Sequence, residues 1–211
     1  MWVLGNENNY GFPGTPEVEP GMGCRAKLQP DAYYAFVNEV AKMIKSIDPD
    51  HPVAICNGET VYLNYFAKHC PDVAVFGANV YRGPNGFGRT YWEDVRDLTD
   101  RPSMITEYGC PSYIKDDTQK GEELQAEYHK GNWEDIAYNM AGSGYGNALG
   151  GVCFEWVDEW WKAGPPPQLD PAKQDWEGWD YKAKTRIPGN FRGPFPDGWL
   201  HEEYLGVASQ G

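Results

Sequence analysis

Short apolar runs alternate with longer amphipathic segments from residue 2 to residue 156, and this alternation most limits what the chain can fold into. The apolar runs have the length of strands, and the segments between them repeat their hydrophobic residues with helical spacing. Strands that alternate with helices are joined by right-handed crossovers and lie parallel in one sheet. The sequence therefore predicts an α/β protein.

The expected strands cover residues 2–4, 52–56, 73–81, 103–106 and 149–156. The expected helices cover 31–47, 60–69, 91–98 and 118–141. Asp31 is expected to cap the first helix, because Asp at this position can accept from the free backbone N–H groups. One face of that helix is expected to be buried, and it comprises Tyr33, Phe36, Val37, Val40, Ala41, Ile44 and Ile47.

A parallel sheet of this kind is either doubly wound or closed into a barrel. No glycine-rich phosphate loop follows any expected strand, so the signature of a nucleotide-binding fold is absent from the sequence. Polar residues instead follow the strand ends, where a (β/α)8 barrel keeps its active site. We therefore predict a partial TIM barrel of about five parallel strands over residues 1–211, with an irregular, aromatic-rich segment at 163–211. The polar residues are Asn6, Glu7, Asn57, Glu59, Asn79, Tyr81, Glu107, Glu155 and Trp156.

Charge and composition narrow the class of ligand. The net charge of −13 argues against binding to nucleic acid or to an anionic membrane, which both favour clustered Lys and Arg. Nine Trp and fourteen Tyr suit sugar rings, which are apolar on their C–H faces, although a Trp-rich core is the alternative. The five Cys form no CxxC pair, so a zinc or redox site is not expected, while one or two disulfides stay open. No metal and no cofactor are expected.

Two carboxylates, Glu7 and Glu107, stand directly after apolar strands. A carboxylate at such a place costs desolvation energy unless it has partners or a chemical role. Retaining glycosidases need two carboxyl groups about 5–5.5 Å apart, of which one is the acid and base and the other the nucleophile. Either residue taken alone could instead be a surface carboxylate or a helix cap.

Four motifs in order resemble the clan of retaining (β/α)8-barrel β-glycosidases that includes families 2 and 5, and the family 2 catalytic domain most of all. The resemblance covers residues 1–162 and matches strands four to eight of that barrel. The four motifs are Gly-Asn-Glu-Asn at 5–8, Asn-Val-Tyr at 79–81, Ile-Thr-Glu-Tyr-Gly at 105–109 and Gly-Val-Cys-Phe-Glu-Trp at 151–156.

This resemblance implies a retaining glycoside hydrolase that acts by double displacement. It implies that Glu7 is the general acid and base, with a pKa raised by the neighbouring charge, and that Glu107 is the nucleophile. The implied substrate-binding residues are Asn6, which would donate to the sugar 2-hydroxyl, Asn79, Tyr81, which would hold Glu107, and Trp156, which would stack on the sugar.

Strands one to three of the clan pattern find no match, and neither does the substrate-binding Arg that they carry. The chain is therefore expected to be a fragment, a half-barrel completed by another chain or by its own dimer, or a degenerate domain. The expected partner is an oligo- or polysaccharide, with no nucleic acid and no membrane. The alternatives to a hydrolase are a non-catalytic carbohydrate-binding or assembly half-barrel and a transglycosidase.

Overall fold

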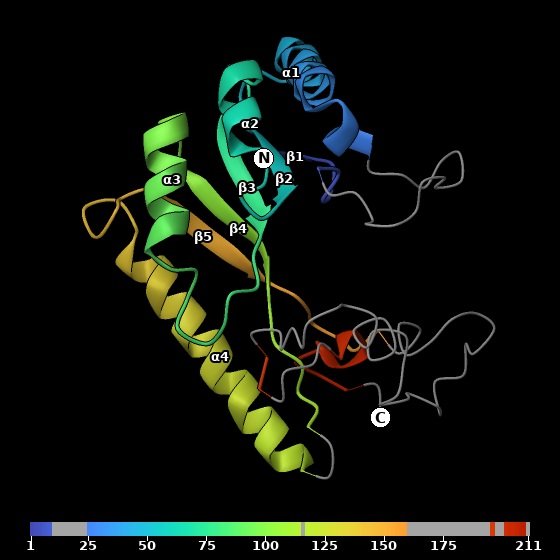
Figure 1. Cartoon of the computed structure of the whole chain (residues 1–211), viewed down its shortest axis with the longest axis vertical. Helices are drawn as coiled ribbons and strands as arrows, with labels where there is room; N and C mark the ends of the chain where they lie inside the picture. The colour runs from blue at the N-terminus through green and yellow to red at the C-terminus, as the bar shows by residue number, and fades with distance from the viewer. Residues whose placement is uncertain (10–24, 115–116, 160–194, 197–200, 210–211) are drawn as a thin grey trace, which may run out of the picture. The chain divides into compact units, whose positions relative to one another are not determined.

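The computed structural model describes residues 1–9, 25–114, 117–159, 195–196 and 201–209, and within them five strands form one sheet (Figure 1). The strands are β1 (Trp2–Leu4), β2 (Val53–Gly58), β3 (Val75–Asn79), β4 (Ser103–Tyr108) and β5 (Ala148–Cys153). The α-helices are α1 (Pro30–Ile47), α2 (Leu63–His69), α3 (Arg89–Thr99) and α4 (Thr118–Tyr138), and two short 3-10 helices are η1 (Arg25–Leu28) and η4 (Glu202–Tyr204). The predicted α/β class is confirmed.

The strand order in the sheet is β1-β2-β3-β4-β5, the same as in the sequence. β1 pairs in parallel with β2, with Trp2 opposite Val53, and β2 pairs in parallel with β3, with Ala54 opposite Val75. A doubly wound sheet reverses its strand order at a switch point, whereas consecutive strands of a barrel follow one another without a reversal. The five strands therefore have the order of a partial (β/α)8 barrel.

The chain divides into two compact units, each of which is described by itself. The first unit comprises Met1–Val80, Phe87–Thr106 and Ile136–Gly151, and the second comprises Tyr81–Gly86, Glu107–Asp135 and Val152–Gly211.

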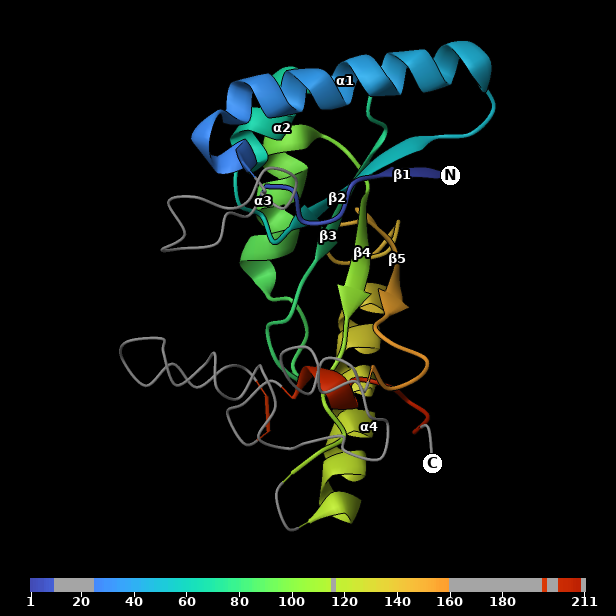
Figure 2. The same cartoon turned by 90° about the vertical axis from the view of Figure 1, so that its right-hand side faces the viewer.

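In the first unit, β2 and β3 are buried along their whole length, as strands covered on both faces of a parallel sheet are. α2 packs against α1 and against α3 (Figure 2). Aromatic rings fill the space beneath the helices, where Phe66 contacts Tyr34 and Phe76 with ring centroids 6.4 and 5.1 Å apart. Gly77 allows β3 to approach its neighbours, because a Cβ there would clash with the carbonyl oxygen of Ile55.

One prediction about α1 is wrong, and another is confirmed only in part. The helix begins at Pro30, so Asp31 lies in its first turn and accepts from Lys68 and His69 instead of capping the helix. Of the predicted buried face, Val37 and Ala41 are buried, whereas Phe36 and Ile47 are 66% and 76% exposed. The side chains on the buried face are Tyr34, Val37, Asn38 and Ala41, which keep the i, i+3, i+4, i+7 spacing.

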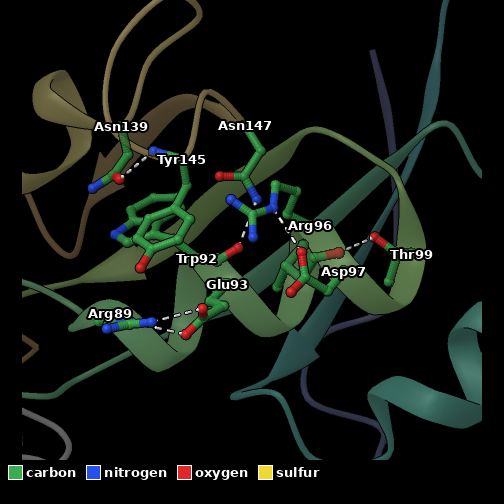
Figure 3. Close-up of polar contacts among 10 residues, drawn as sticks. Arg89, Trp92, Glu93, Arg96, Asp97, Thr99, Asn139, Tyr145 and Asn147 are labelled. Atoms are coloured by element: carbon green, nitrogen blue, oxygen red, sulfur yellow. Dashed lines mark hydrogen bonds and ion pairs between the residues drawn. The ribbon is translucent and has the colours of Figure 1, made fainter.

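α3 is tied to the segment that precedes β5, as Figure 3 shows. The Arg96 guanidinium lies over the Tyr145 ring, with 4.8 Å from its carbon to the ring centroid. The Asn147 side chain donates to the Trp92 carbonyl oxygen at 3.0 Å, so the loop before β5 is fixed to the buried face of the helix. Arg89 and Glu93 form a bidentate pair on the exposed face, with both N–O distances at 3.0 Å.

In the second unit, the segment around η4 is held by polar contacts with the residues that follow β4. Gln125, buried on α4, donates to the carbonyl oxygens of Cys110 and Gly206 at 2.9 and 3.0 Å. The rings of Tyr113 and Tyr204 stack with centroids 4.6 Å apart.

The described cysteines Cys56, Cys70, Cys110 and Cys153 are free thiols, so none of the disulfides left open by the sequence joins two of them. Among the described residues, no helix is both long enough and apolar enough to cross a bilayer.

Candidate active site

The backbone turns sharply where β1 ends, and this turn positions Glu7. Gly5 and Glu7 both have positive φ, at 71° and 52°, and the second value is unusual for a residue with a side chain. The Glu7 N–H donates to the Cys56 carbonyl oxygen at 3.0 Å, which anchors the turn to β2. Such strain persists only where the surroundings enforce it, and it is common at functional sites.

Asn79, buried at the end of β3, connects Asn6 and Glu7. Its side-chain NH2 group donates to Asn6 Oδ1 at 2.9 Å and to Glu7 Oε1 at 3.1 Å. Three residues that were predicted from the sequence to belong to the site therefore meet in one hydrogen-bonded group.

Cys56 and Thr106 complete this group, and neither was predicted from the sequence to belong to the site. The Thr106 hydroxyl donates to Asn79 Oδ1 at 2.7 Å. The Cys56 thiol lies 3.2 Å from both Asn6 Oδ1 and Asn79 Oδ1 and 3.3 Å from Thr106 Oγ1. Thr106 stands in the Ile-Thr-Glu-Tyr-Gly motif beside Glu107, whereas the only sequence signal for Cys56 is its place near the end of a strand. We call Asn6, Glu7, Cys56, Asn79 and Thr106 the Glu7 cluster.

Two further asparagines, Asn9 and Asn57, hold the loops around the Glu7 cluster. The Asn9 amide donates to the Gly58 carbonyl oxygen at 2.8 Å and accepts from the Gly58 N–H at 2.6 Å. Asn57 accepts from the Tyr34 hydroxyl at 2.7 Å and donates to the Glu59 carbonyl oxygen at 3.0 Å. Both side chains are buried, so the polar loops after β1 and β2 are locked by fully directed contacts.

A second group, in the second unit, contains Glu107. The Tyr81 hydroxyl donates to Glu107 Oε2 at 3.1 Å, and both side chains are half-buried. The Tyr81 ring packs against Phe195, with centroids 6.3 Å apart. A hydrogen bond to a carboxylate favours its ionised form, which is the form that a nucleophile needs.

Trp156 follows β5, and its side chain is 76% exposed. Its backbone carbonyl oxygen accepts from the Ala208 N–H at 3.0 Å, which fixes the main chain beneath the ring. The stacking role of Trp156 stays a prediction. Trp176, Trp179 and Trp199, in the aromatic-rich segment 163–211, lie outside the described residues.

The arrangement offers two carboxylates, each at the end of a strand and each accepting from a neutral donor. The Glu7–Glu107 separation stays a prediction, because the two residues belong to different units. Among the described residues, no group of three or more His, Cys, Asp and Glu side chains is placed to hold a metal ion. The chemistry that these groups can perform is proton transfer by one carboxyl and nucleophilic attack by another.

No protein-family model matches the chain, and no curated protein matches it. Solved structures that resemble it include a β-glucuronidase of an uncultured Clostridium species, with 16% identity over 60% of this chain and a TM-score of 0.46. A β-D-glucuronidase of Dictyoglomus thermophilum has 16% identity over 75% of this chain and a TM-score of 0.48. A putative β-galactosidase of Bacteroides fragilis has 19% identity over 62% of this chain and a TM-score of 0.45.

This chain spans only a part of those proteins: 23% of the Clostridium chain, 25% of the Dictyoglomus chain and 21% of the Bacteroides chain. The likeness is distant, so the case for a function depends on the residues of this chain.

Proposed function

We propose that this chain carries the catalytic residues of a retaining glycoside hydrolase acting on β-glycosidic bonds. Glu7 is the general acid and base, and Glu107 is the nucleophile. The observation that supports this most is a pair of hydrogen bonds: Asn79 donates to Glu7 and Tyr81 donates to Glu107. Asn79 is the last residue of β3 and Tyr81 stands two positions later in the sequence, so each carboxylate has a neutral donor of its own.

The reaction then takes two steps. In the first, a Glu107 oxygen bonds to the anomeric carbon, the bond to the leaving oxygen breaks, and Glu7 gives its proton to that oxygen. In the second, Glu7 takes a proton from water as the water oxygen bonds to the anomeric carbon and the ester to Glu107 breaks. Asn6 hydrogen-bonds the sugar 2-hydroxyl, and Trp156 stacks on a sugar face.

A mechanism-based label tests the nucleophile. Dinitrophenyl 2-deoxy-2-fluoro-β-glycosides of glucose, galactose, mannose and glucuronic acid are incubated with the chain, and the labelled peptide is found by mass spectrometry. We expect one glycosyl group on Glu107 and none in Glu107→Gln. Glu93→Gln is the matched control, because Glu93 lies on α3 in an exposed pair with Arg89. Labelling at another carboxylate would contradict the assignment.

The stereochemistry of the product is an independent test. Proton NMR of the first product from an aryl β-glycoside should show the β-anomer, which later equilibrates with the α-anomer. If the α-anomer forms first, the enzyme inverts, and Glu107 is then a base that activates water instead of a nucleophile.

The exposure of Trp156 favours a second candidate, a non-catalytic carbohydrate-binding protein. Such a protein would bind oligosaccharides, lose affinity on Trp156→Ala, and turn over no aryl glycoside. Equal binding by the wild type and by Glu107→Gln, with no turnover by either, would favour this candidate over the hydrolase.

A further inference from the structure

Among the described residues of β2, only Cys56 has a side chain that contacts both amides of the Glu7 cluster, those of Asn6 and Asn79. Its sulfur lies 3.2 Å from Asn6 Oδ1 and 3.2 Å from Asn79 Oδ1, and the side chain is 5% exposed. The backbone carbonyl oxygen of the same residue accepts from the Glu7 N–H at 3.0 Å. Cys56 thus contacts the Glu7 segment through both its main chain and its side chain.

The orientation of the Asn79 amide decides whether Glu7 faces its NH2 group, which donates a hydrogen bond, or its oxygen. Asn79 Oδ1 accepts from the Thr106 hydroxyl and faces the thiol, which is a donor, while the NH2 group donates to Glu7 and Asn6. A flip of this amide would place its oxygen against the Asn6 amide oxygen and the ionised form of Glu7, where acceptors repel each other, and the Thr106 hydroxyl and the thiol would have to turn their protons away from its NH2 group. The donors on the Oδ1 side therefore hold the NH2 group toward Glu7.

The same thiol also orients Asn6. The Asn6 amide oxygen accepts from Asn79 and lies within reach of the thiol proton, so its NH2 group is the end that can donate to a ligand. Because a thiol has one proton, it donates to one of the two amide oxygens at a time.

We infer that Cys56 is a positioning residue for the acid and base Glu7: its thiol fixes the Asn79 and Asn6 amides, and Asn79 in turn holds the Glu7 carboxyl. This inference rests on the proposed function. A weak, neutral thiol donor suits this position, because it fixes the amides without adding a charge beside the carboxyl. Without it, Asn79 would be held on its Oδ1 side by Thr106 alone, and the Glu7 carboxyl would sample more than one position.

The test compares Cys56→Val, which fills the space but has no donor, with Cys56→Ser, which restores one. Cys70→Val is the matched control, since Cys70 is an equally buried thiol that donates to the Tyr34 carbonyl oxygen outside the cluster. Circular dichroism and urea unfolding establish that each variant is folded.

The discriminating readout is the dependence of kcat/KM on the leaving group. A phenyl β-glycoside needs the Glu7 proton to depart, whereas a dinitrophenyl β-glycoside departs without it. We expect Cys56→Val to lower kcat/KM for the phenyl substrate by about 10-fold or more and for the dinitrophenyl substrate by less than about 3-fold, while Cys56→Ser recovers most of the difference. Equal losses on both substrates, or the same pattern in Cys70→Val, would overturn the inference.

A second readout does not need turnover. The side-chain NH2 signals of 15N-labelled Asn79 should be one sharp pair in the wild type and broadened by exchange in Cys56→Val, but not in Cys70→Val. If the wild type is inactive but its Asn79 signals are sharp and broaden in Cys56→Val, the proposed function is wrong and the thiol still fixes the amide. If the wild type is active and Cys56→Val leaves the Asn79 signals unchanged, only the inference about Cys56 is wrong.

Discussion

At the scale of single residues, the Tyr81–Glu107 hydrogen bond has the most direct expected consequence. Tyr81→Phe removes the hydroxyl that donates at 3.1 Å and keeps the ring that packs on Phe195. A hydrogen bond to a charged group contributes about 1.5–3 kcal/mol, so kcat on an aryl β-glycoside should fall by about 10- to 100-fold.

Steady-state kinetics measures that loss, with Tyr138→Phe as the control. Tyr138 is 65% exposed at the end of α4, so its hydroxyl can be removed without touching the Glu107 group. An unchanged kcat for Tyr81→Phe would remove Tyr81 from the catalytic machinery.

His129 gives a residue-scale prediction about pH. Burial lowers the pKa of this imidazole, which packs edge-on against Tyr108 with ring centroids 5.7 Å apart. The unfolded chain takes up a proton below about pH 6.5, while the folded chain resists it. The stability due to the neutral ring is thus fully present above about pH 6.5 and is lost as the pH falls through the lowered pKa.

Urea unfolding between pH 7.5 and 5 checks this for wild type and His129→Phe, which keeps a ring against Tyr108. We expect the variant to lose less of its stability over this range. Parallel curves for the two proteins would show that another group causes the loss.

Most site residues that stand in a recognisable motif were predictable from the sequence, whereas Cys56 and Thr106 were missed. Asn6, Glu7 and Asn79 were predicted from motifs, and the structure brings them together. Cys56 continues an apolar run in β2 and therefore resembles core, and Thr106 is overshadowed by the neighbouring Glu107 in its motif. Their role depends on contacts across three strands, which no local pattern encodes.

At the scale of secondary-structure elements, β1 is held to the end of α1 by one side-chain contact. The Trp2 indole donates to Asp48 at 2.9 Å. This hydrogen bond, and to a smaller extent the one from His51, lowers the pKa of Asp48 to about 2. Since the unfolded value is about 3.9, the stability from this contact is present above about pH 4 and is lost as the pH falls through about 2.

Trp2→Phe keeps the ring and removes the N–H, so we expect the pKa of Asp48 to rise toward its usual value. An NMR titration of the Asp48 carboxyl measures it directly. Trp133→Phe is the control, because Trp133 is also a half-exposed tryptophan but lies on α4. A pKa that stays near 2 in Trp2→Phe would assign the shift to His51.

Element types were predictable because strands and helices have different periods, but the buried face of α1 was predictable only in part. Its sequence holds two apolar stripes, one with Tyr34, Val37 and Ala41 and one with Phe36, Met43 and Ile47. Periodicity cannot choose between two stripes of similar hydrophobicity. The choice is made by tertiary contacts, such as the Tyr34 ring against Phe66 and its hydroxyl on Asn57.

At the scale of the whole molecule, the order of strands follows from the alternation of strands and helices. Whether the outer strands pair with a further strand does not follow from it. Among the described strands, β1 and β5 are the outer ones. Val3 on β1 is 47% exposed and Leu149 on β5 is 52% exposed, so each outer strand presents an exposed apolar side chain. Exposed edges of this kind pair with further strands.

We therefore predict that the 211-residue chain associates with copies of itself through these edges. Sedimentation velocity over a concentration series should show oligomers, and Val3→Lys together with Leu149→Lys should shift the chain toward monomer, because charged side chains block edge pairing. Ile47→Lys is the matched control, since Ile47 is 76% exposed on α1 but is not on a strand. If only Ile47→Lys dissociates the oligomers, the copies associate through the outer face of α1. If the wild type is monomeric at every concentration, the edges do not pair with a second copy.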